Sequence, residues 1–425
     1  MTSPERPSIF GAGLIALDLV IGADPTSPVR AWAGGTCGNV LSILAYLGWD
    51  AYPIARMNGD PASERVQADM KRWDVRLDFA GCEPVCHTPI IVQEIRRGHD
   101  GTPTHRFVWS CPECGRRLPK FKPITRSAVD VVEQALSGAA VFFMDRLSRA
   151  TLLLAARASA EGTVVVFEPS GKGDPKLFAE ALRIAHLVKY SEQQSAAIEG
   201  VMQDDTADTA VLVEVQTLGR YGLKFRHRFG RKVSKWCVLD AVPAPFLADI
   251  CGSGDWCTAG LLAEIAAKGR AGLHQAGPDK VRAALRYGQA LAAWNCGYEG
   301  ARGGMYAMDH ATFLQQIEAL TAGRANFAKR SPNDELSNTV VTCPACPPVR
   351  PQGEPDTSGT GYRRLDESRI ECDKNSRNSQ STKVWYPTVK QSKPRPYSGN
   401  HSCIQNLARV PRVGLREIGA ARLSI

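Results

Sequence analysis

The feature that most constrains the fold is a regular alternation of short, β-branched apolar runs with longer segments of helical period, which continues to about residue 325. This alternation is typical of βαβ units packed over a mainly parallel sheet. The sequence predicts strands at residues 8–14, 51–57, 139–144, 163–167, 186–190 and 210–217. It predicts helices at residues 38–47, 62–73, 128–136, 150–161, 176–184, 253–268 and 279–295. The expected fold class is therefore α/β.

One interval departs from the alternation. Residues 88–96 and 104–110 are two strand-like runs joined by Gly-His-Asp-Gly-Thr-Pro, a composition typical of a turn. We expect a β hairpin inserted between α/β units, placed where it could act as a lid over a site. Because an exposed hairpin edge invites pairing with a second copy of the chain, the lid is a candidate surface for a homodimer.

The texture of the sequence changes after residue 330. Ten of the 27 prolines fall in the last 95 residues, and no periodicity persists there. We predict a disordered or poorly packed tail at residues 329–425, after a single domain at residues 1–328. Residues 331–425 also carry 14 lysines and arginines against 9 acidic residues, and this excess is more than half of the chain's net charge of +9.

The composition excludes several classes of protein. With 425 residues, 44% apolar and 22% charged, the chain is neither fibrous nor disordered throughout. The first apolar run, residues 8–22, is interrupted by Asp18, so we expect neither a signal peptide nor a membrane span and predict a cytoplasmic protein. The 13 cysteines are then expected as reduced thiols unless a metal holds some of them. No block of basic residues indicates a nucleic-acid partner.

The most informative segment is the loop Asp-Ile-Cys-Gly-Ser-Gly-Asp at residues 249–255, which opens an evident helix. Gly252 and Gly254 around Ser253 let the backbone turn tightly, and the following helix directs its unpaired N–H groups and the positive end of its dipole into the loop. We expect an anion hole here, with Asp255 close enough to take a proton from a hydroxyl that attacks a bound phosphate. The alternative is that Ser253 or Asp255 only caps the helix.

A second glycine-rich turn precedes an early helix. Gly34 and Gly35 lie at its start, and Asn39 follows about one turn in, where its amide can both donate to and accept from a polyol. The alternative is an ordinary turn with a surface asparagine. Upstream, Asp18 is a lone acid inside an apolar run at the end of a strand, so it must be paired, exposed or used.

In this order, the three segments resemble the ribokinase-like (PfkB-type) carbohydrate kinase family over roughly residues 8–325. The specific parts are Ala-Gly-Gly…Asn…Leu-Gly at residues 33–48 and Asp-x-x-Gly-x-Gly-Asp at residues 249–255. The resemblance implies a doubly wound, mainly parallel sheet with a small β lid. It also implies phosphorylation of a hydroxyl on a sugar or similar alcohol, with ATP and Mg²⁺, by a kinase domain at residues 1–328.

The resemblance also assigns roles by position. The general base would be Asp255, and the anion hole would be formed by Gly252, Ser253 and Gly254. Substrate hydroxyls would be held by Asp18, Gly34, Gly35 and Asn39. A Thr-x-Gly-x-x-Gly turn would meet the nucleotide phosphates, through Thr217, Gly219 and Gly222, and the asparagine beside the adenine would be Asn295.

One element departs from the family pattern. The family has Asn-x-x-Glu after the strand predicted at residues 186–190, where it helps to organise Mg²⁺ through water, whereas this chain has Ser191-Glu-Gln-Gln194. Either Glu192 takes that role or ATP phosphates hold most of the metal, which Mg²⁺ tolerates because it keeps its waters. Three cations at predicted strand ends could meet ATP phosphates or an acidic substrate, although most such cations only solvate a surface: Arg146, Lys172 and Lys189.

The stretch Cys-Pro-Glu-Cys-Gly at residues 111–115 has the form of a zinc knuckle. Antiparallel pairing of the hairpin would bring two further cysteines near it, for a Zn²⁺ site of four thiolates: Cys82, Cys86, Cys111 and Cys114. The alternative is a pair of turn cysteines without metal. A competing half-site, Cys-Pro-Ala-Cys, lies in the tail at residues 343–346.

Three functions are compatible with these patterns. The first is a sugar kinase that uses MgATP, and the second is a non-catalytic relative that binds a sugar or nucleotide and signals through the lid or tail. The third is a metal-dependent interaction protein. Only the first consumes ATP when a substrate is added. The acceptor itself is not identified by plausible lining residues such as Trp32, Arg56 and Asn58.

Overall fold

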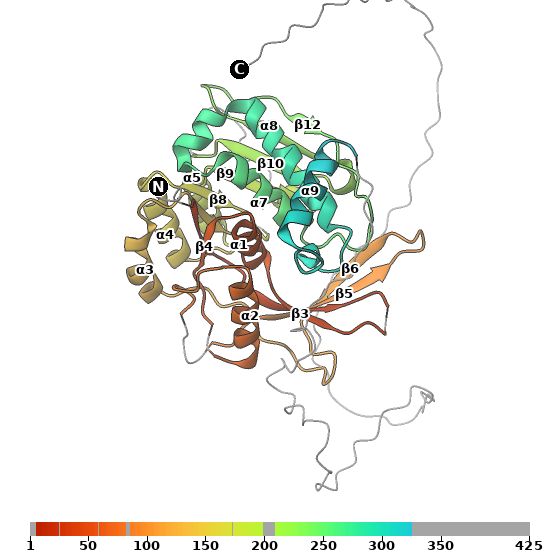
Figure 1. Cartoon of the computed structure of the whole chain (residues 1–425). Helices are drawn as coiled ribbons and strands as arrows, with labels where there is room; N and C mark the ends of the chain where they lie inside the picture. The colour runs from red at the N-terminus through yellow and green to blue at the C-terminus, as the bar shows by residue number, and fades with distance from the viewer. Residues whose placement is uncertain are drawn as a thin grey trace, which may run out of the picture. The chain divides into compact units, whose positions relative to one another are not determined.

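The computed structural model describes residues 6–24, 26–57, 59–81, 86–171, 173–198 and 209–324, which contain two β sheets (Figure 1). The expected α/β class is confirmed. Several sequence predictions fall outside the described residues: the tail at 329–425 with its Cys-Pro-Ala-Cys half-site, and the side chains Asn58, Cys82 and Lys172.

The large sheet has eight strands in the order β12-β11-β10-β9-β8-β7-β1-β4. The six strands β10, β9, β8, β7, β1 and β4 are parallel, and the sequence predicted each of them. β11 and β12 form an antiparallel edge that the sequence did not predict. The central strands β7 and β8 are apolar throughout because both faces of the sheet are covered. Their bounds are β1 Ser8–Ala12, β4 Asp50–Pro53, β7 Val141–Met144, β8 Val164–Phe167, β9 Leu187–Ser191, β10 Val213–Thr217, β11 Leu223–His227 and β12 Cys237–Leu239.

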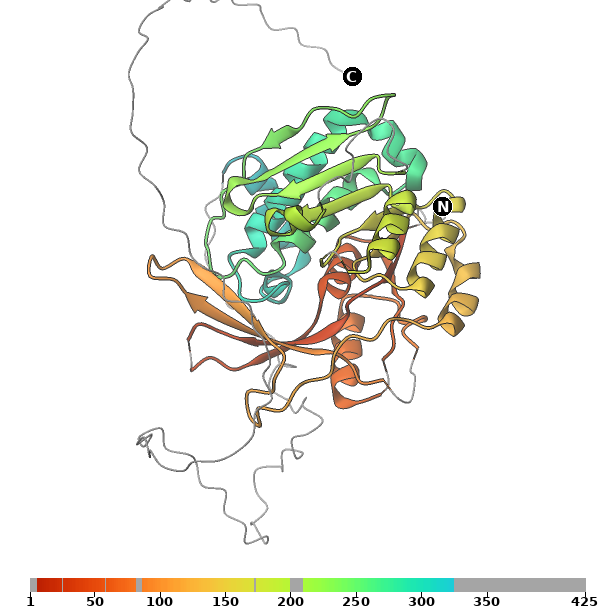
Figure 2. The same cartoon turned by 180° about the vertical axis from the view of Figure 1, so that it is seen from behind.

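Helices cover both faces of this sheet, as the views from opposite sides show (Figures 1 and 2). One face carries α1 (Thr36–Tyr46), α7 (Ser253–Ile265) and α8 (Gly269–Asn295), with α9 (His310–Thr321) packed on α8. The other carries α3 (Arg126–Val132), α4 (Arg149–Ala160), α5 (Pro175–Ile184) and α6 (Glu192–Ile198). Alternate residues of one strand enter the two cores: Val141 and Phe143 of β7 join the first, Phe142 and Met144 the second. The predicted doubly wound arrangement is therefore confirmed.

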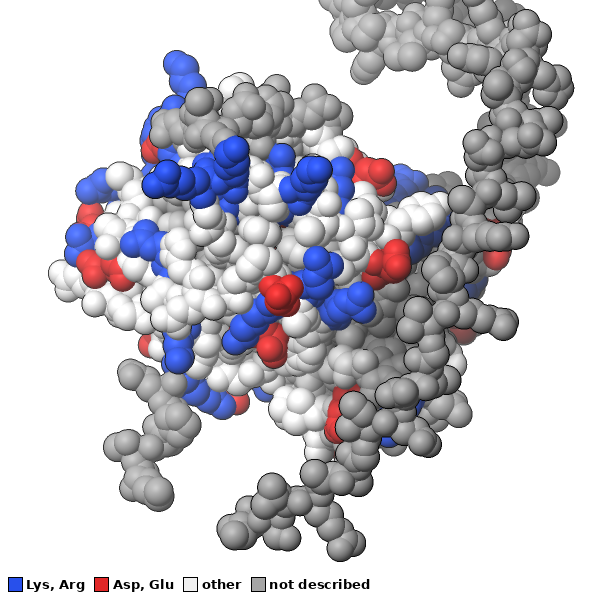
Figure 3. All heavy atoms as spheres, turned by 90° about the horizontal axis from the view of Figure 1, so that it is seen from above, with Lys and Arg blue, Asp and Glu red and all other residues white. Residues whose placement is uncertain are grey.

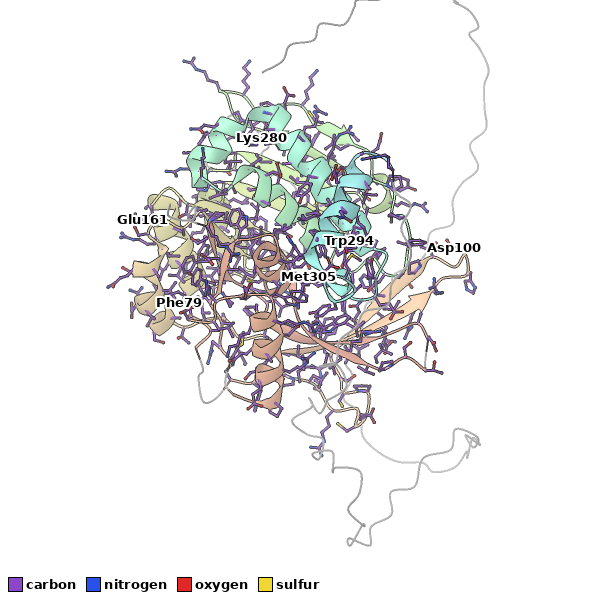
Figure 4. All side chains as sticks on the ribbon, viewed as in Figure 1. Phe79, Asp100, Glu161, Lys280, Trp294 and Met305 are labelled. Carbon is purple, nitrogen blue, oxygen red and sulfur yellow. The ribbon has the colours of Figure 1, made fainter. Side chains whose placement is uncertain are left out.

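The lid is a four-stranded sheet in the order β3-β2-β5-β6. Its strands are β2 (Ala16–Ile21), β3 (Arg30–Gly34), β5 (Ile90–Arg97) and β6 (Pro103–Val108), and α2 (Pro61–Arg72) packs against β2 and β3. The predicted hairpin is β5 and β6, and Asp100 lies at its tip (Figure 4). The lid is thus twice as wide as the hairpin that the sequence indicated.

The apolar run at residues 8–22 divides between the two sheets. β1 ends at Ala12 and β2 begins at Ala16, so Asp18 lies inside a lid strand. The prediction that Asp18 ends the first strand is therefore wrong. The break requires Gly13, because a Cβ there would lie 1.8 Å from Oδ1 of Asp145. Two consecutive apolar strands look like one in sequence, since hydrophobicity does not record which sheet a strand joins.

Local sequence explains where several helices begin. Asp60 accepts a hydrogen bond from Ser63 N, with Pro61 as the first residue of α2. Three other helices start in the same way, with side-chain caps at Ser148, Asp174 and Asp309. The helix predicted from residue 279 is the second half of α8, which kinks at Gly277 (φ 64°, ψ 179°) before Pro278.

Charged side chains are distributed over the face seen in Figure 3, where acidic residues lie among lysines and arginines. This matches the near balance of charge outside the tail. None of the helices in the described ranges combines the length and the apolar character that a membrane span requires.

Candidate active site

Gly252 immediately precedes α7, and its backbone is left-handed, with φ 75° and ψ −4°. A Cβ atom here would lie 2.3 Å from the backbone oxygen of Ala301, so only glycine fits. Since Gly252 occupies the N-cap position, neither Ser253 nor Asp255 caps the helix, and that alternative is wrong. The N–H groups of the first turn are directed into the loop, as an anion hole requires.

Asp255 lies in the first turn of α7 with its carboxylate facing α1. The side-chain N–H of Asn39 donates to Asp255 Oδ2 at 2.8 Å. Burial, assisted by the negative charge of Glu168 and opposed by the bond from Asn39, raises the pKa of Asp255 to about 8. A carboxyl group with this pKa exchanges its proton near neutral pH, as a general base should.

Arg302 fixes the orientation of the Asn39 amide. Its Nε donates to Asn39 Oδ1 at 3.2 Å, and because a guanidinium can only donate, the amide N–H₂ must face Asp255. Arg302 is held in turn by the buried Asp69 carboxylate at 2.9 Å and by the backbone oxygen of Ala33. Sequence reasoning missed Arg302 and Asp69, which lie 233 positions apart and carry no local signal.

A buried ion pair lies beside Asp255. Lys189 of β9 contacts Glu168, the residue after β8, at 2.9 Å, and the hydroxyl of Thr258 in α7 donates to the other oxygen of Glu168. Burial by itself lowers the pKa of Lys189, but the charge and the hydrogen bond of Glu168, together with Cys257 and Asp255, outweigh it and the pKa is raised. Lys189, considered above as a cation at a strand end, is thus buried and paired. Glu168 was missed, although an acid directly after an apolar strand was its signal.

Asp145 follows β7 and was also missed. Its Oδ1 accepts from Leu14 N and its Oδ2 from Arg146 Nη1, both at 2.8 Å. Burial, opposed by Arg146, raises the pKa of Asp145 to about 6. Polar residues at the carboxyl ends of parallel strands meet at the edge where open α/β sheets bind ligands. Here they are Asp145, Glu168, Ser191 and Thr217.

Asp18 projects from the lid with its carboxylate packed on bare backbone. A Cβ on Gly34 would lie 1.9 Å from Asp18 Oδ2, and Gly35 N lies 3.4 Å from the same oxygen. Within the described residues Oδ1 has no hydrogen-bond partner although it is buried. Burial, opposed by the bond from Gly35, raises the pKa of Asp18 to about 7. An unpartnered buried oxygen is costly unless a ligand donates to it, so this site is suited to a substrate hydroxyl.

Asp249 joins the anion loop to the lid. Its Oδ2 accepts from the Gln93 side chain of β5 and from Gly300 N, and its Oδ1 accepts from Cys251 N at 3.0 Å. Both oxygens are therefore occupied by neighbours from the lid and from the body. A movement of the lid would therefore displace the loop that precedes Asp255.

The predicted nucleotide turn joins β10 to β11, with Thr217 as the last residue of β10. Gly219 and Gly222 have φ of 57° and 93°. A Cβ on Gly222 would lie 2.1 Å from the backbone oxygen of Leu239, whereas one on Gly219 would meet nothing within 4 Å. Gly222 is therefore required by packing, and the open side of the turn is at Gly219.

Asn295 is fully buried and supports the anion loop from behind. Its Nδ2 donates to the backbone oxygens of Gly300 and Ala301, and its Oδ1 accepts from Gly304 N. The Ala301 oxygen also accepts from Trp256 Nε1 at 3.0 Å, and Trp294, labelled in Figure 4, packs on Trp256. The amide of Asn295 is thus engaged within the protein, and its position beside the adenine stays a prediction.

The element at residues 191–194 lacks the acid that the family uses near Mg²⁺. Gln194 Oε1 accepts from Ser191 N at 3.1 Å, and the side chain of Glu192 is exposed. Among the residues that the structure describes, no group of three or more His, Cys, Asp or Glu side chains could hold a metal ion. A small number of protein ligands at this element would fit a magnesium ion held mainly by ATP phosphates and water.

The zinc hypothesis gains no support from the described residues. Cys111 is buried and Cys114 exposed at either end of a tight turn in which Gly115 N donates to Cys111 O at 2.9 Å. Cys86 is buried, and Cys82 lies outside the described ranges. The cysteines that can be placed form no metal cluster.

A family model of pfkB family carbohydrate kinases matches residues 26–307, about two thirds of the chain. The chain belongs to this family. The match covers both glycine-rich segments, so the resemblance noted from the sequence is confirmed. A search of curated proteins found no match.

Solved structures share the pfkB-family fold at low sequence identity. A fructokinase from Xylella fastidiosa with bound ATP is 17% identical, with a TM-score of 0.55 over 75% of this chain and 98% of that one. A ribokinase from Arabidopsis thaliana with ribose and ATP is 16% identical, with 0.53 over 74% and 99%. A nucleoside kinase from Burkholderia thailandensis with inosine is 16% identical, with 0.54 over 76% and 99%. At such identities the likeness establishes the fold alone.

Proposed function

We propose that this chain transfers the γ-phosphoryl group of ATP to a hydroxyl of a sugar or sugar-like alcohol. The observation that carries the proposal is the position of Asp255, a buried carboxyl with a pKa of about 8 directly after the glycine loop. In this role Asp255 accepts the proton of the attacking hydroxyl. The N–H groups of residues 252–254 stabilise the charge of the phosphoryl group in transfer.

The remaining residues position the two substrates. Asp18, Gly34, Gly35 and Asn39 would hold acceptor hydroxyls, and the turn at Thr217 and Gly219 would meet ATP phosphates. Mg²⁺, carried by those phosphates, would neutralise part of their charge. Lys189 and Glu168 carry opposite charges beside Asp255, and Lys189 offsets part of the effect of Glu168 on the base.

The decisive experiment is ADP release by wild type and Asp255→Asn over a panel of sugars, sugar phosphates, sugar acids and nucleosides. We expect the variant to lose turnover by at least about a hundredfold, the usual contribution of a general base, while its affinity for ATP stays close to wild type. The exposed acid Asp279 in α8 gives a matched control, Asp279→Asn, which should behave as wild type. Near wild-type turnover by Asp255→Asn would refute the assignment.

The departure at Ser191 and Gln194 favours one competing function, a non-catalytic relative that binds a sugar or nucleotide. Such a protein would retain the geometry of Asp255 but release no ADP with any acceptor. Titration of the wild-type chain with ATP and with the same panel separates the two. Binding without turnover throughout the panel would support the non-catalytic relative.

A further inference from the structure

A cavity of about 370 Å³ lies beside the candidate site for substrate hydroxyls, between the base of the lid and the carboxyl ends of β1 and β7. We call it the basic pocket. Its lining includes Leu14, Ile91, Trp109, Lys120, Phe121 and Arg146. None of these side chains has a part in the phosphoryl transfer proposed above.

The basic pocket shares a wall with the site around Asp18. Ile91 is the register partner of Asp18 in the parallel pair β2–β5, so both side chains project from the same face of the lid. The backbone oxygen of Leu14, on the opposite wall, would lie only 2.5 Å from a Cβ on Gly35. A ligand held at Asp18 and Gly35 can therefore extend into the pocket.

Two cations line the pocket, and no acidic residue does. Nη1 of Arg146 donates to the carboxylate and backbone oxygens of Asp145 at 2.8 and 3.0 Å, which fixes the guanidinium while 27% of the side chain stays exposed. Within the described residues, two groups of Arg146, Nε and Nη2, make no hydrogen bond or ion pair. The same is true of the ammonium of Lys120. A fixed guanidinium with unused N–H groups, beside a lysine, is suited to phosphate or carboxylate oxygens.

Asp145 offsets part of the positive charge of Arg146, but it leaves Lys120 and the other N–H groups of Arg146 available to an anion. Both of its carboxylate oxygens are engaged, one by Leu14 N and the other by Arg146. A second, smaller pocket shares Pro89 and Phe121 with the first and adds two more basic residues nearby, Arg56 and Lys122.

The same cavity offers apolar surface for the carbon skeleton of a ligand. Trp109 follows β6 and is 52% exposed, which is unusual for so large an aromatic side chain, and Phe121, half-buried, lines the same pocket. An aromatic surface next to fixed cations suits a ligand with a carbon face and an anionic end.

The sheet order separates this pocket from the nucleotide turn. β7, which ends beside Arg146, is three strands from β10, which ends at Thr217. With neighbouring strands about 4.8 Å apart, the two strand ends are separated by roughly 14 Å. The cations of the basic pocket therefore face the acceptor side of the site and not the ATP phosphates.

We infer that the basic pocket binds an anionic group, a phosphate or a carboxylate, carried by the acceptor, so that the substrate is a sugar phosphate or a sugar acid and not a neutral sugar. This inference rests on the proposed function, since it names the substrate class of the same site.

The test compares matched acceptors that differ only at one end: neutral sugars, the same sugars with a terminal phosphate, and the same sugars with a terminal carboxylate. ADP release gives kcat and KM for the full chain, and calorimetric titration of Asp255→Asn gives affinity without turnover. We expect anionic acceptors to bind at least tenfold more tightly than their neutral counterparts, as one charge-assisted hydrogen bond provides. Whether phosphates or carboxylates bind better separates the two sources of negative charge.

Two substitutions in the pocket and one outside it complete the design. Arg146→Met and Lys120→Met should each raise the KM for the anionic acceptor about 10- to 100-fold and change kcat little, because the lost contact is equal in ground and transition states. Lys120 is exposed, so its variant will fold even if Arg146→Met disturbs Asp145. The control is Arg157→Gln in α4, where the exposed Arg157 pairs with Glu161.

The outcomes separate the two claims. If neutral acceptors bind and react as well as anionic ones, or if neither pocket variant changes the KM for an anionic acceptor, the inference is overturned while the kinase activity stands. If anionic acceptors bind through Arg146 and Lys120 but no ADP is released, the inference holds and the proposed function fails. If no anionic acceptor in the series binds, the inference is overturned.

Discussion

The two glycines of the anion loop should differ in how the same added methyl group affects stability. In Gly252→Ala, the methyl group would lie 2.3 Å from the Ala301 oxygen, and the residue would have to keep φ near 75°. A left-handed alanine costs about 1–2 kcal/mol, and the overlap adds about 1–3 kcal/mol. For a domain of this size, a loss of about 2–5 kcal/mol lowers the melting temperature by about 3–7 °C.

In Gly254→Ala, the same methyl group meets only Lys189 Nζ, at an ordinary 3.5 Å, and the backbone is already helical. Since alanine is the better helix former, by up to about 1 kcal/mol, the melting temperature should be unchanged or slightly higher. Turnover should nevertheless fall about a hundredfold or more, because the methyl group would occupy the space that phosphoryl oxygens need beside the first-turn N–H groups.

The assay is a thermal melt and ADP release for wild type and both variants, with ATP affinity measured separately. The reasoning requires that stability and activity separate: Gly252→Ala loses both, and Gly254→Ala loses activity alone. Wild-type turnover by Gly254→Ala would show that this loop does not hold the phosphoryl group. An unchanged melting temperature in Gly252→Ala would show that the contact with Ala301 relaxes without cost.

Two further predictions concern stability. Asp18→Asn should raise the substrate KM yet stabilise the fold by about 1 kcal/mol at pH 8, because a buried carboxylate oxygen without a partner is destabilising. The native pKa of Asp18, about 7, exceeds the unfolded value of 3.8, so the wild type loses stability as pH rises from about 4 to 7. The melting temperatures of wild type and Asp18→Asn should therefore converge toward pH 4. A stability advantage of Asp18→Asn that grows on acidification would contradict this. A chain ending at residue 330 should keep its melting temperature and its ADP release, since all the described elements and candidate site residues lie before residue 325; a large loss of either would place part of the fold beyond that point.

The sequence by itself determined the elements whose signals are local. Buried parallel strands such as Val164–Phe167 can be predicted because they are apolar throughout. Helices that begin with Asp-Pro or Ser caps can be predicted because the cap and the helical period lie within a few residues. The loop at residues 249–255 could also be predicted from the sequence, since a tight turn before a helix needs glycine. These signals were sufficient to indicate the family.

Tertiary structure alone decided which of these pieces meet. It divided the run at residues 8–22 between two sheets and buried Lys189 against Glu168. It also joined Arg302 to Asn39 across 263 positions, and it bonded the amide of Asn295 to the backbone behind the loop. Side chains of one chemical type look alike in sequence whether they are exposed or paired. Their burial, and with it the pKa of Asp255, depends on the order of strands and the packing of distant helices, which no short segment encodes.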